Sequence, residues 1–516
     1  MNEHVLRALN RGAVAMLLLL LPIEAGPGAA APEGQIRWAA PFSISPTLFD
    51  PAEYQGSITS MMTFYALHDA LLKPMRGDAM APGLAESWGV TRDGLAYDFV
   101  LRKNVTFHNG DVMTAEDVKF SVERYRGTGA KLLKEKIAGV EVIDPRRVRI
   151  RLKEPWPDFM TFFGTPATGA GWIIPKRYLE RVGDEGFKRA PIGAGPYRFV
   201  SFTPGVELVL EAHDRFWRKE PSVKRLVFRG VPDESTRLAM LKRGEVDIAY
   251  NIRGPLAEEV QRTPGLKLTH ALLAATFWVD FTNGQWDSRS PWHDRRVRLA
   301  VALAIDRSGI NQAETLGFSR PASSIIPIGF GFAWPAPAIA YDPARAKALL
   351  AEAGYPNGFE AGDYVCEMPF ASVGEAVVNY LGAVGIRSRL RSLERAAFGT
   401  YARQKTATHL LQGQSSSFGN AVTRIERHMV SGGDLAFGSY AEMDELFRQQ
   451  AKEASRAKRE ALLHRIQRLA YEHVMFAPIW QAAQLNGVRA GIEQPGIGLI
   501  DYLPYSSPYE DLRVRP

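Results

Sequence analysis

Apolar and polar residues alternate in several short segments of the chain, which is the pattern of a β-strand with one buried face. The clearest segment covers residues 95–101, and residues 148–152 and 197–202 repeat the pattern. We therefore predict strands in all three segments. No repeat of fixed period and no long low-complexity linker separates them, so an array of independent modules is not expected.

Helices are predicted between the strands, because capping residues precede segments whose apolar residues recur at helical spacing. Thr114 and Asp117, three residues later, resemble a capping box. Ser439 and Glu442 resemble another, and the apolar positions after them keep helical spacing toward Val474. Strands and helices along the whole chain predict the mixed α/β fold class.

The N-terminal segment, residues 1–31, has the order of a secretory signal peptide. Arg7 and Arg11 precede an apolar segment at 13–23, and small residues follow it. The apolar segment is shorter than the roughly 20 residues that a membrane-spanning helix needs. Cys366, the only cysteine, lies too far away to carry a lipid anchor. We expect this segment to be cleaved and the mature protein to be soluble in the periplasm.

The composition is that of a globular protein long enough for two or three domains, with 516 residues of which 46% are hydrophobic and 23% charged. The formal net charge is +7. A basic chain can bind nucleic acid, but here cations are interspersed with acids, as Arg456 and Lys458 are with Glu453 and Glu460. We interpret the charges as a solvated surface and expect a monomer with no nucleic-acid partner.

Motifs of enzymes and cofactor sites are sparse. No phosphate-binding loop occurs, and Pro196 directly after residues 193–195 breaks the dinucleotide-binding pattern. Ser455 and Lys458 fit the S-x-x-K motif of penicillin-binding enzymes, but the companion motifs are missing. The ten histidines show no metal-ligand spacing, and His108 is interpreted as structural. We therefore expect no catalytic site, no metal and no cofactor.

One ordered set of motifs spans most of the chain. The longest, residues 84–118, contains LAESW, DG, YDF, LRKNV, FHNG and TAEDV in that order. Together the motifs resemble the family 5 extracellular solute-binding proteins, which are the dipeptide-, oligopeptide- and nickel-binding subunits of ABC importers. The shorter motifs lie at 46–51, 191–197, 244–248, 297–307 and 353–359.

The resemblance implies a type II periplasmic-binding-protein fold of two lobes with an extra domain. Lobe I would combine residues 32–60, 190–280 and 481–516. The extra domain, residues 61–189, would be inserted in it, and lobe II would span residues 281–480. Such lobes close around a ligand, which a permease at the inner membrane then accepts unaltered.

The resemblance also indicates where the ligand site lies. In dipeptide-binding relatives, a lobe II loop resembling GW..D supplies an aspartate for the amino group of the peptide. The aligned loop here, residues 413–420, lacks both the tryptophan and the acid, and residues 368–372 lack the arginine expected to meet the carboxylate. Because an unpaired buried charge is costly, we predict that a free zwitterionic dipeptide is not the preferred ligand.

The candidate ligand contacts come from this loop and from aromatic residues. The amide and hydroxyl groups of the loop suit a neutral, hydroxylated or amide-rich solute, or the backbone of a longer peptide. For the aromatic residues, packing in the core is the alternative interpretation. The candidates are Tyr54, Trp278, Trp334, Gln414, Ser415, Ser416, Ser417, Phe418 and Asn420.

Three alternatives stay open on the sequence, and one of them is a basic periplasmic chaperone or nucleic-acid binder, which would show a steeply salt-dependent affinity. The same fold could carry a non-peptide solute such as an opine, a sugar or a metal chelate. A secreted hydrolase could also assemble a serine site from distant segments, which a sequence motif does not reveal.

Overall fold

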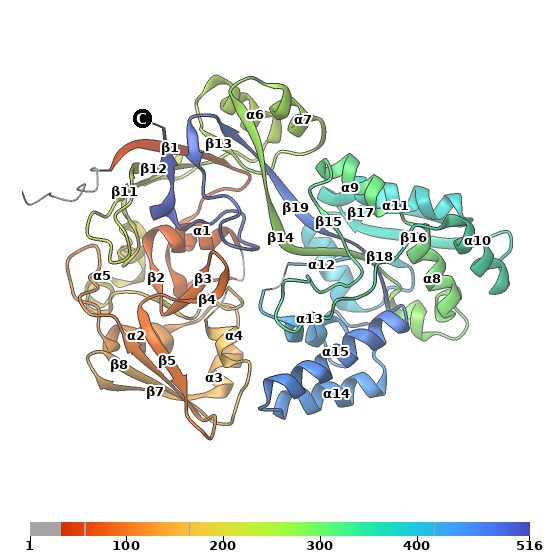
Figure 1. Ribbon diagram of the computed structural model, residues 1–516, viewed down its shortest axis with the longest axis horizontal. Coiled ribbons are helices and arrows are strands. Elements are labelled where there is room, and N and C mark those ends of the chain that lie inside the picture. The colour runs from red at the N-terminus through yellow and green to blue at the C-terminus, as the bar shows by residue number, and fades with distance from the viewer. Residues whose placement is uncertain (1–31, 56–57, 165, 417, 516) are drawn as a thin grey trace, which may run out of the picture. The chain divides into compact units, whose positions relative to one another are not determined.

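The computed structural model describes residues 32–55, 58–164, 166–416 and 418–515. The predicted signal peptide, residues 1–31, lies outside these ranges, as does Ser417 of the candidate loop. Within the described ranges, strands and helices are mixed along the whole chain, which confirms the predicted α/β class (Figure 1).

The largest element is an 11-stranded mixed sheet assembled from distant parts of the sequence. Its strands, in spatial order, are β10 (Tyr197–Thr203), β11 (Glu207–Ala212), β12 (Val223–Gly230), β1 (Glu33–Ala40), β13 (Ile248–Ala249), β19 (Phe476–Arg489), β14 (Leu266–Asp280), β18 (Leu410–Ser415), β16 (Phe359–Glu367) and β17 (Ile386–Leu393), with β15 (Arg320–Pro321) paired to β19. β1 pairs in parallel with both β12 and β13, whereas β14 and β19 pair antiparallel.

The two long strands β14 and β19 connect the two ends of this sheet (Figure 1). They contain 15 and 14 residues and pair from Leu266 with Arg489 to Asp280 with Phe476. β19 is buried at every position from Ala477 to Val488. A strand buried on both faces has no polar alternation, which explains why the alternating pattern did not indicate it.

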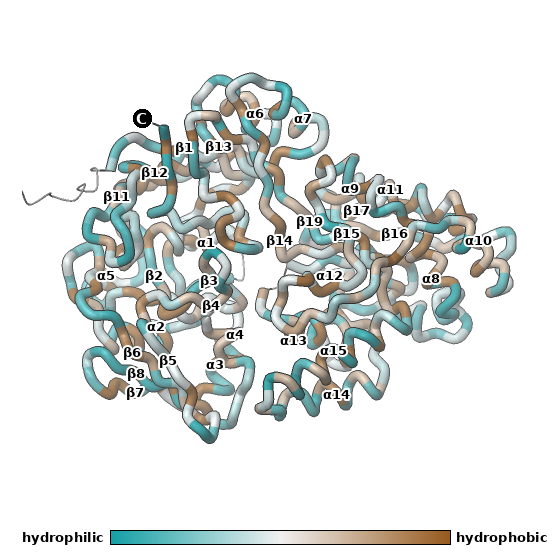
Figure 2. The backbone as a smooth tube through the Cα atoms, viewed as in Figure 1, coloured by the Kyte–Doolittle hydropathy of each residue, from teal (hydrophilic) through white to brown (hydrophobic). Residues whose placement is uncertain are grey.

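A separate four-stranded antiparallel sheet lies within residues 61–189. Its strands, in order, are β5 (Ala85–Val90), β6 (Ala96–Leu101), β8 (Arg147–Leu152) and β7 (Ile137–Asp144). The odd-numbered residues from 97 to 101 and the even-numbered residues from 148 to 152 are buried. Hydrophobic and hydrophilic segments both occur in the region of β6, β7 and β8 (Figure 2). The three strands predicted from alternation are therefore confirmed as β6, β8 and β10.

The predicted capping box at Thr114 is confirmed in α2 (Ala115–Arg124). The Thr114 backbone N–H donates to Asp117 Oδ2 at 2.9 Å, and the Thr114 side chain completes the reciprocal arrangement. This satisfies N–H groups that the first turn of a helix otherwise leaves unpaired.

The predicted cap at Ser439 is wrong. α14 (Ala441–Lys452) is preceded by Tyr440, and the Ser439 hydroxyl donates instead to Asp444 Oδ1 at 2.8 Å. The apolar spacing toward Val474 belongs to a second helix, α15 (Arg456–Glu472), which Ser455 caps. The serine of the S-x-x-K motif is thus a helix N-cap, which accounts for its presence without catalysis.

Separate hydrophobic clusters underlie the small sheet and the β16 end of the large sheet. The lobe boundaries drawn from the sequence stay a prediction.

The remaining α-helices and strands complete the fold. They are α1 (Ile58–Leu67), α3 (Ala130–Lys136), α4 (Phe159–Phe163), α5 (Lys176–Arg189), α6 (Glu234–Arg243), α7 (Gly254–Arg262), α8 (Arg295–Ala304), α9 (Arg307–Thr315), α10 (Pro343–Glu352), α11 (Ala371–Ala383), α12 (Arg395–Gln404), α13 (Ala421–His428) and the strand pairs β2 (Asp69–Ala70) with β9 (Trp172–Ile173), β3 (Leu72–Met75) with β4 (Asp78–Pro82), and β20 (Ile492–Gln494) with β21 (Arg513–Val514).

Candidate ligand-binding site

The candidate loop leaves the large sheet at the end of β18 and enters α13. Gly413 pairs with Trp278 of β14. A side chain at 413 is excluded, because a Cβ there would lie 2.1 Å from Trp278 Nε1. Asn420 begins α13 by accepting a hydrogen bond from Val422 N at 2.9 Å, so the loop is held at both ends. Of the loop serines, Ser415 is buried in β18, Ser416 is exposed and Ser417 lies outside the described residues.

α13 is anchored to β14 by the fully buried Arg424. Its Nη1 donates to Thr276 Oγ1 at 3.0 Å, and its Nη2 donates to the Ala274 carbonyl at 2.6 Å. Burial lowers the pKa of this guanidinium to about 9, because removal from water disfavours the charged form. The hydrogen bonds from Arg424 therefore fix the helix that follows the loop.

Polar side chains meet beside the Gln414 end of the loop. Glu367, at the end of β16, is 4% exposed and accepts hydrogen bonds from Gln414 Nε2 and from Arg395 Nε, the latter at 2.7 Å. The Arg395 side chain, at the start of α12, remains 77% exposed. Met368, next to Glu367, is exposed as well. The cluster presents a cation, an amide and an apolar side chain to solvent.

Residues of the predicted lobe I approach this cluster. Arg253, the N-cap residue of α7, donates from Nη1 to the Pro369 carbonyl at 3.4 Å. Tyr505 lies near the guanidinium groups of Arg253 and Arg395. Burial raises the pKa of its hydroxyl to about 12, while the charges of Arg237, Arg253 and Arg395 act to lower it. Both guanidinium groups already have a carboxylate partner, Glu234 at 3.7 Å for Arg253 and Glu367 at 2.7 Å for Arg395. Both side chains stay partly exposed, so the donors that these pairs do not use can meet an anionic group of a ligand.

A pocket of about 620 Å³ lies at the other end of the loop. Its volume falls in the range of small-molecule sites. Among the predicted contacts, Phe418 lines it. One wall is formed by Gln55, Thr128, Phe162, Pro166 and Ala167, and the other by Phe418, Thr423, Glu426, Arg427, Gly432, Gly433 and Asp434.

Asn420 links the loop to the predicted extra domain. Its Nδ2 donates to Asp158 Oδ1 at 3.1 Å and to Thr161 Oγ1 at 3.2 Å. Asp158 Oδ2 in turn accepts from Arg459 Nη2 in an ion pair that is buried on both sides. Arg459 Nε donates to Gln450 Oε1 at 2.9 Å. This network connects the start of α4 with α13 and α15.

Tyr54 and Trp278 are each only 1% exposed. The Tyr54 hydroxyl donates to the Pro166 carbonyl at 3.0 Å, so Tyr54 supports the wall of the 620 Å³ pocket from behind. Trp278 packs edge to face against His428 with ring centroids 5.1 Å apart. Both aromatic residues therefore act on the site through the elements that they position.

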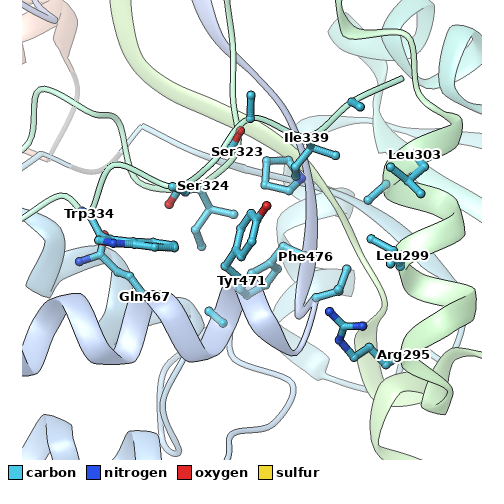
Figure 3. A pocket seen from close by; sticks show the side chains of 18 of the residues that line it. Arg295, Leu299, Leu303, Ser323, Ser324, Trp334, Ile339, Gln467, Tyr471 and Phe476 are labelled. Atoms are coloured by element: carbon cyan, nitrogen blue, oxygen red, sulfur yellow. The ribbon is translucent and has the colours of Figure 1, made fainter. Parts of the chain in front are cut away.

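Trp334 lines a different, mostly apolar pocket of about 310 Å³ (Figure 3). Figure 3 shows its indole on one side, Leu299 and Leu303 on the other, and Tyr471 between them. The rings of Trp334 and Tyr471 meet edge to face with centroids 5.6 Å apart. No described residue of the loop at 414–420 lines this pocket, so the structure does not bring Trp334 together with the loop.

Sequence reasoning missed the charged residues of the site. Glu367 and Arg395 are 28 positions apart and meet only because the end of β16 lies beside the start of α12. Glu426 and Arg427 belong to a helix of mixed charge, which is typical of a solvated surface. The one available signal was the position of Glu367, immediately before the segment in which an arginine was expected.

The predicted structural role of His108 is confirmed. Its Nε2 donates to the Gly195 carbonyl at 3.0 Å, and its Nδ1 accepts from Gly193 N at 3.2 Å. Among the described residues, no group of His, Cys, Asp and Glu side chains is arranged to hold a metal ion. In the same part of the chain, none of the helices is both long and apolar enough to span a bilayer.

Residues 79–433 match the family described as bacterial extracellular solute-binding proteins, family 5 Middle. The chain belongs to this family. The solute-binding protein is 29% identical over 398 residues to the glutathione-binding protein GsiB of Salmonella choleraesuis strain SC-B67, which covers 74% of this chain and 73% of that one. It is 27% identical over 501 residues to GsiB of Escherichia coli O1:K1 / APEC, which covers 92% and 93%.

The fold of this solute-binding protein is also that of known structures. The ABC transporter substrate binding protein CtaP from Listeria monocytogenes superposes with a TM-score of 0.81 at 18% identity, covering 94% of this chain and all of that one. This likeness confirms the predicted type II periplasmic-binding-protein fold. The chain is a solute-binding protein of the kind that serves ABC importers, as its motifs predicted, and its relatives are binding proteins.

Proposed function

We propose that this solute-binding protein captures a peptide-like or related small organic solute in the periplasm and passes it unaltered to an ABC importer permease. Export through the predicted signal peptide, a monomeric state and the absence of a nucleic-acid partner are parts of the same proposal. The family match and the dispersed surface charges support it.

The loop at 414–420 is the observation that carries the proposal. At one end it meets the cluster of Glu367, Gln414 and Arg395, and at the other it borders the 620 Å³ pocket. The pocket walls come from residues 55–167 on one side and 418–434 on the other. A solute bound there would contact both walls at once, which is how a ligand favours a closed arrangement over an open one.

The exposed guanidinium of Arg395 suggests that the solute carries an anionic group. The carboxylate of Glu367 holds Arg395 through Nε, which leaves the Nη donors for a second carboxylate. Glutathione, the ligand named for the GsiB relatives, is a peptide-like solute with two carboxylates and is the first compound to test. The proposal adds a cation that the sequence did not indicate, so the carboxylate of a ligand need not stay unpaired. That a free dipeptide is not the preferred ligand stays a prediction, which the dipeptide in the titrations below tests.

Titration calorimetry of the mature protein with glutathione, a tripeptide, a dipeptide, an opine and a sugar tests the proposal. We expect the tripeptide or glutathione to bind best and Arg395→Gln to weaken that binding about tenfold, which corresponds to ~1.4 kcal/mol. A ligand at 100 times its dissociation constant should also stabilise the protein by about 2.7 kcal/mol in thermal unfolding.

Arg387→Gln is the matched control, because Arg387 pairs with Glu360 near the start of β16, and both side chains are exposed there. It should leave the affinity unchanged. Chemical conversion of any bound compound, or preference for an opine or sugar with no response to the peptide-like solutes, would contradict the proposal.

A further inference from the structure

The pocket of about 310 Å³ that contains Trp334 is separate from the solute-binding pocket (Figure 3). The described residues that line it all lie between 295 and 478, inside the predicted lobe II, whereas the walls of the 620 Å³ pocket come from residues 55–167 and 418–434. Closure of two lobes is therefore not needed to form it. Large apolar and aromatic side chains meet there and stay only half-buried, namely Leu299, Leu303, Trp334, Ile339, Tyr471 and Phe476. Such a group of exposed apolar surfaces in one hollow is typical of a binding site.

Two helices form opposite walls of this pocket through residues at helical spacing. In α8, Arg295, Leu299 and Leu303 follow one another at intervals of four residues and so share one face of the helix. In α15, Gln467 and Tyr471 have the same spacing. Each wall is thus a continuous helix face rather than a flexible loop, which keeps the pocket open without a ligand.

The third wall is a loop that hydrogen bonds hold against α15. The Trp334 backbone N–H donates to Gln467 Oε1 at 2.8 Å, and Gln467 Nε2 donates to the Phe332 carbonyl at 2.8 Å. The guanidinium carbon of Arg468 lies 5.6 Å from the centre of the Trp334 ring. The indole is therefore fixed in the position from which it lines the pocket.

Two polar groups of the pocket remain available to a ligand. Arg295 is the only charged residue among the described ones that line it, and its side chain is exposed at the rim. Its Nε donates to the Glu472 carbonyl, but the guanidinium has no carboxylate partner in the part of the chain that the structure describes. The Tyr471 hydroxyl likewise has no described hydrogen-bond partner, and Figure 3 shows it directed away from α15.

We propose that this pocket is a second ligand site, which takes a small aromatic carboxylic acid with its ring between the apolar walls and its carboxylate at Arg295. An apolar cavity of about 150 Å³ holds benzene, so a pocket of about 310 Å³ has room for an aromatic ring and a short chain. The rings of Trp334 and Tyr471 offer aromatic partners to the ligand ring. The inference goes beyond the proposed function, because it concerns a site that the transported solute does not occupy.

Titration calorimetry with phenylbutyrate tests the inference. Phenylbutanol and phenylbutylamine have the same ring and chain without the negative charge. We expect phenylbutyrate to bind with one equivalent per chain and a dissociation constant below about 1 mM. It should bind about threefold more tightly than the alcohol, since a solvent-exposed ion pair contributes little, and the amine should bind most weakly. Salt at about 0.5 M should remove most of the preference for the acid, because it screens exposed charges.

Two kinds of variant locate the site. Arg295→Gln should abolish the preference for the acid and leave the affinity for the alcohol within about twofold. The matched control is Arg296→Gln, because Arg296 is the next residue of α8, is also exposed, pairs with Asp294 at 2.6 Å and does not line the pocket. It should keep the preference.

The apolar walls are tested by a variant that fills the pocket and by one that opens it. Ala470→Phe places a ring in the pocket, and Trp334→Ala removes one wall. Each should lower the affinity for both the acid and the alcohol by at least about tenfold. Thermal unfolding of the empty proteins shows which variants are folded, and a folded variant of either kind is sufficient for the test.

The outcomes separate this site from the solute site. Saturation with glutathione should leave the binding of phenylbutyrate unchanged, and competition between the two would overturn the inference. So would the absence of phenylbutyrate binding, equal wild-type affinity for the acid and the alcohol, or unchanged affinity in a folded Ala470→Phe or Trp334→Ala variant. If glutathione does not bind, only the proposed function is affected, because the phenylbutyrate titrations do not require a solute.

Discussion

Removal of the Asp158 carboxylate should destabilise the protein far more than the loss of an ordinary surface charge. Asp158 accepts from Asn420 Nδ2 at 3.1 Å and from Arg459 Nη2, and the side chains of Asp158 and Arg459 are 8% and 5% exposed. In Asp158→Ala the guanidinium of Arg459 stays buried without its counter-charge. Among the described residues, Gln450 at 2.9 Å and the Phe332 ring, 5.3 Å from the guanidinium carbon, are the side-chain partners that remain.

Breaking a buried ion pair by removal of one partner costs about 3–5 kcal/mol. We expect the free energy of unfolding, measured by urea denaturation at pH 7, to fall by about that amount. The hydrogen bond from Asn420 is lost in the same variant, which adds to the cost because its amide is left with Thr161 alone as acceptor.

Two further variants distinguish the cost of an unpaired buried charge from the cost of substitution in general. Asp98→Asn removes a carboxylate whose partner Arg149 lies 2.6 Å away at the surface, where such pairs contribute about 0–1 kcal/mol. Replacing Asp158 by Ala and Arg459 by Met together removes both charges, and it should recover part of the lost stability. A loss below about 1 kcal/mol in Asp158→Ala, or no recovery in the double variant, would refute the reasoning.

Two other predictions concern a buried histidine and a glycine of the candidate loop. His68 is fully buried, and burial lowers its pKa to about 4. In the unfolded chain the pKa of a histidine is about 6.5, so the unfolded state takes up a proton before the folded state does as the pH falls. The contribution of His68 to stability is therefore complete above pH 6.5 and decreases toward pH 4, by about 2 kcal/mol between pH 7 and pH 5. His68→Gln should reduce the loss of stability that urea unfolding measures between the two pH values by this amount. Other buried histidines, such as His108, whose pKa burial lowers to about 3, account for the rest of the loss. Gly413→Ala should lower the unfolding free energy by about 1–3 kcal/mol through overpacking against Trp278. Gly382→Ala in α11, where an added Cβ meets nothing within 4 Å, should not destabilise the protein, and equal losses in both variants would argue against this explanation.

The strands with one buried face and the helices with local caps could be predicted from the sequence. In β6 the buried residues alternate with more exposed ones, and in α2 the cap is formed by residues three positions apart, so the information is local. β19 was not indicated, because burial on both faces removes the alternation. The predicted cap of α14 was wrong for a different reason. The Ser439 hydroxyl donates to the side chain of Asp444 within the helix, and a capping motif in the sequence does not show this bond.

The site was predicted only in part, because a sequence shows residue types but not which hydrogen bonds the fold already uses. Asn420 was a candidate ligand contact as a polar residue in a loop, yet its Oδ1 caps α13 and its Nδ2 binds Asp158 and Thr161. Glu367 gave the opposite outcome. It was not a candidate, yet its buried carboxylate accepts from Gln414 Nε2 of the loop and from Arg395 Nε, which is 28 positions further along the chain. Contacts between segments so far apart in the sequence arise only from the tertiary fold.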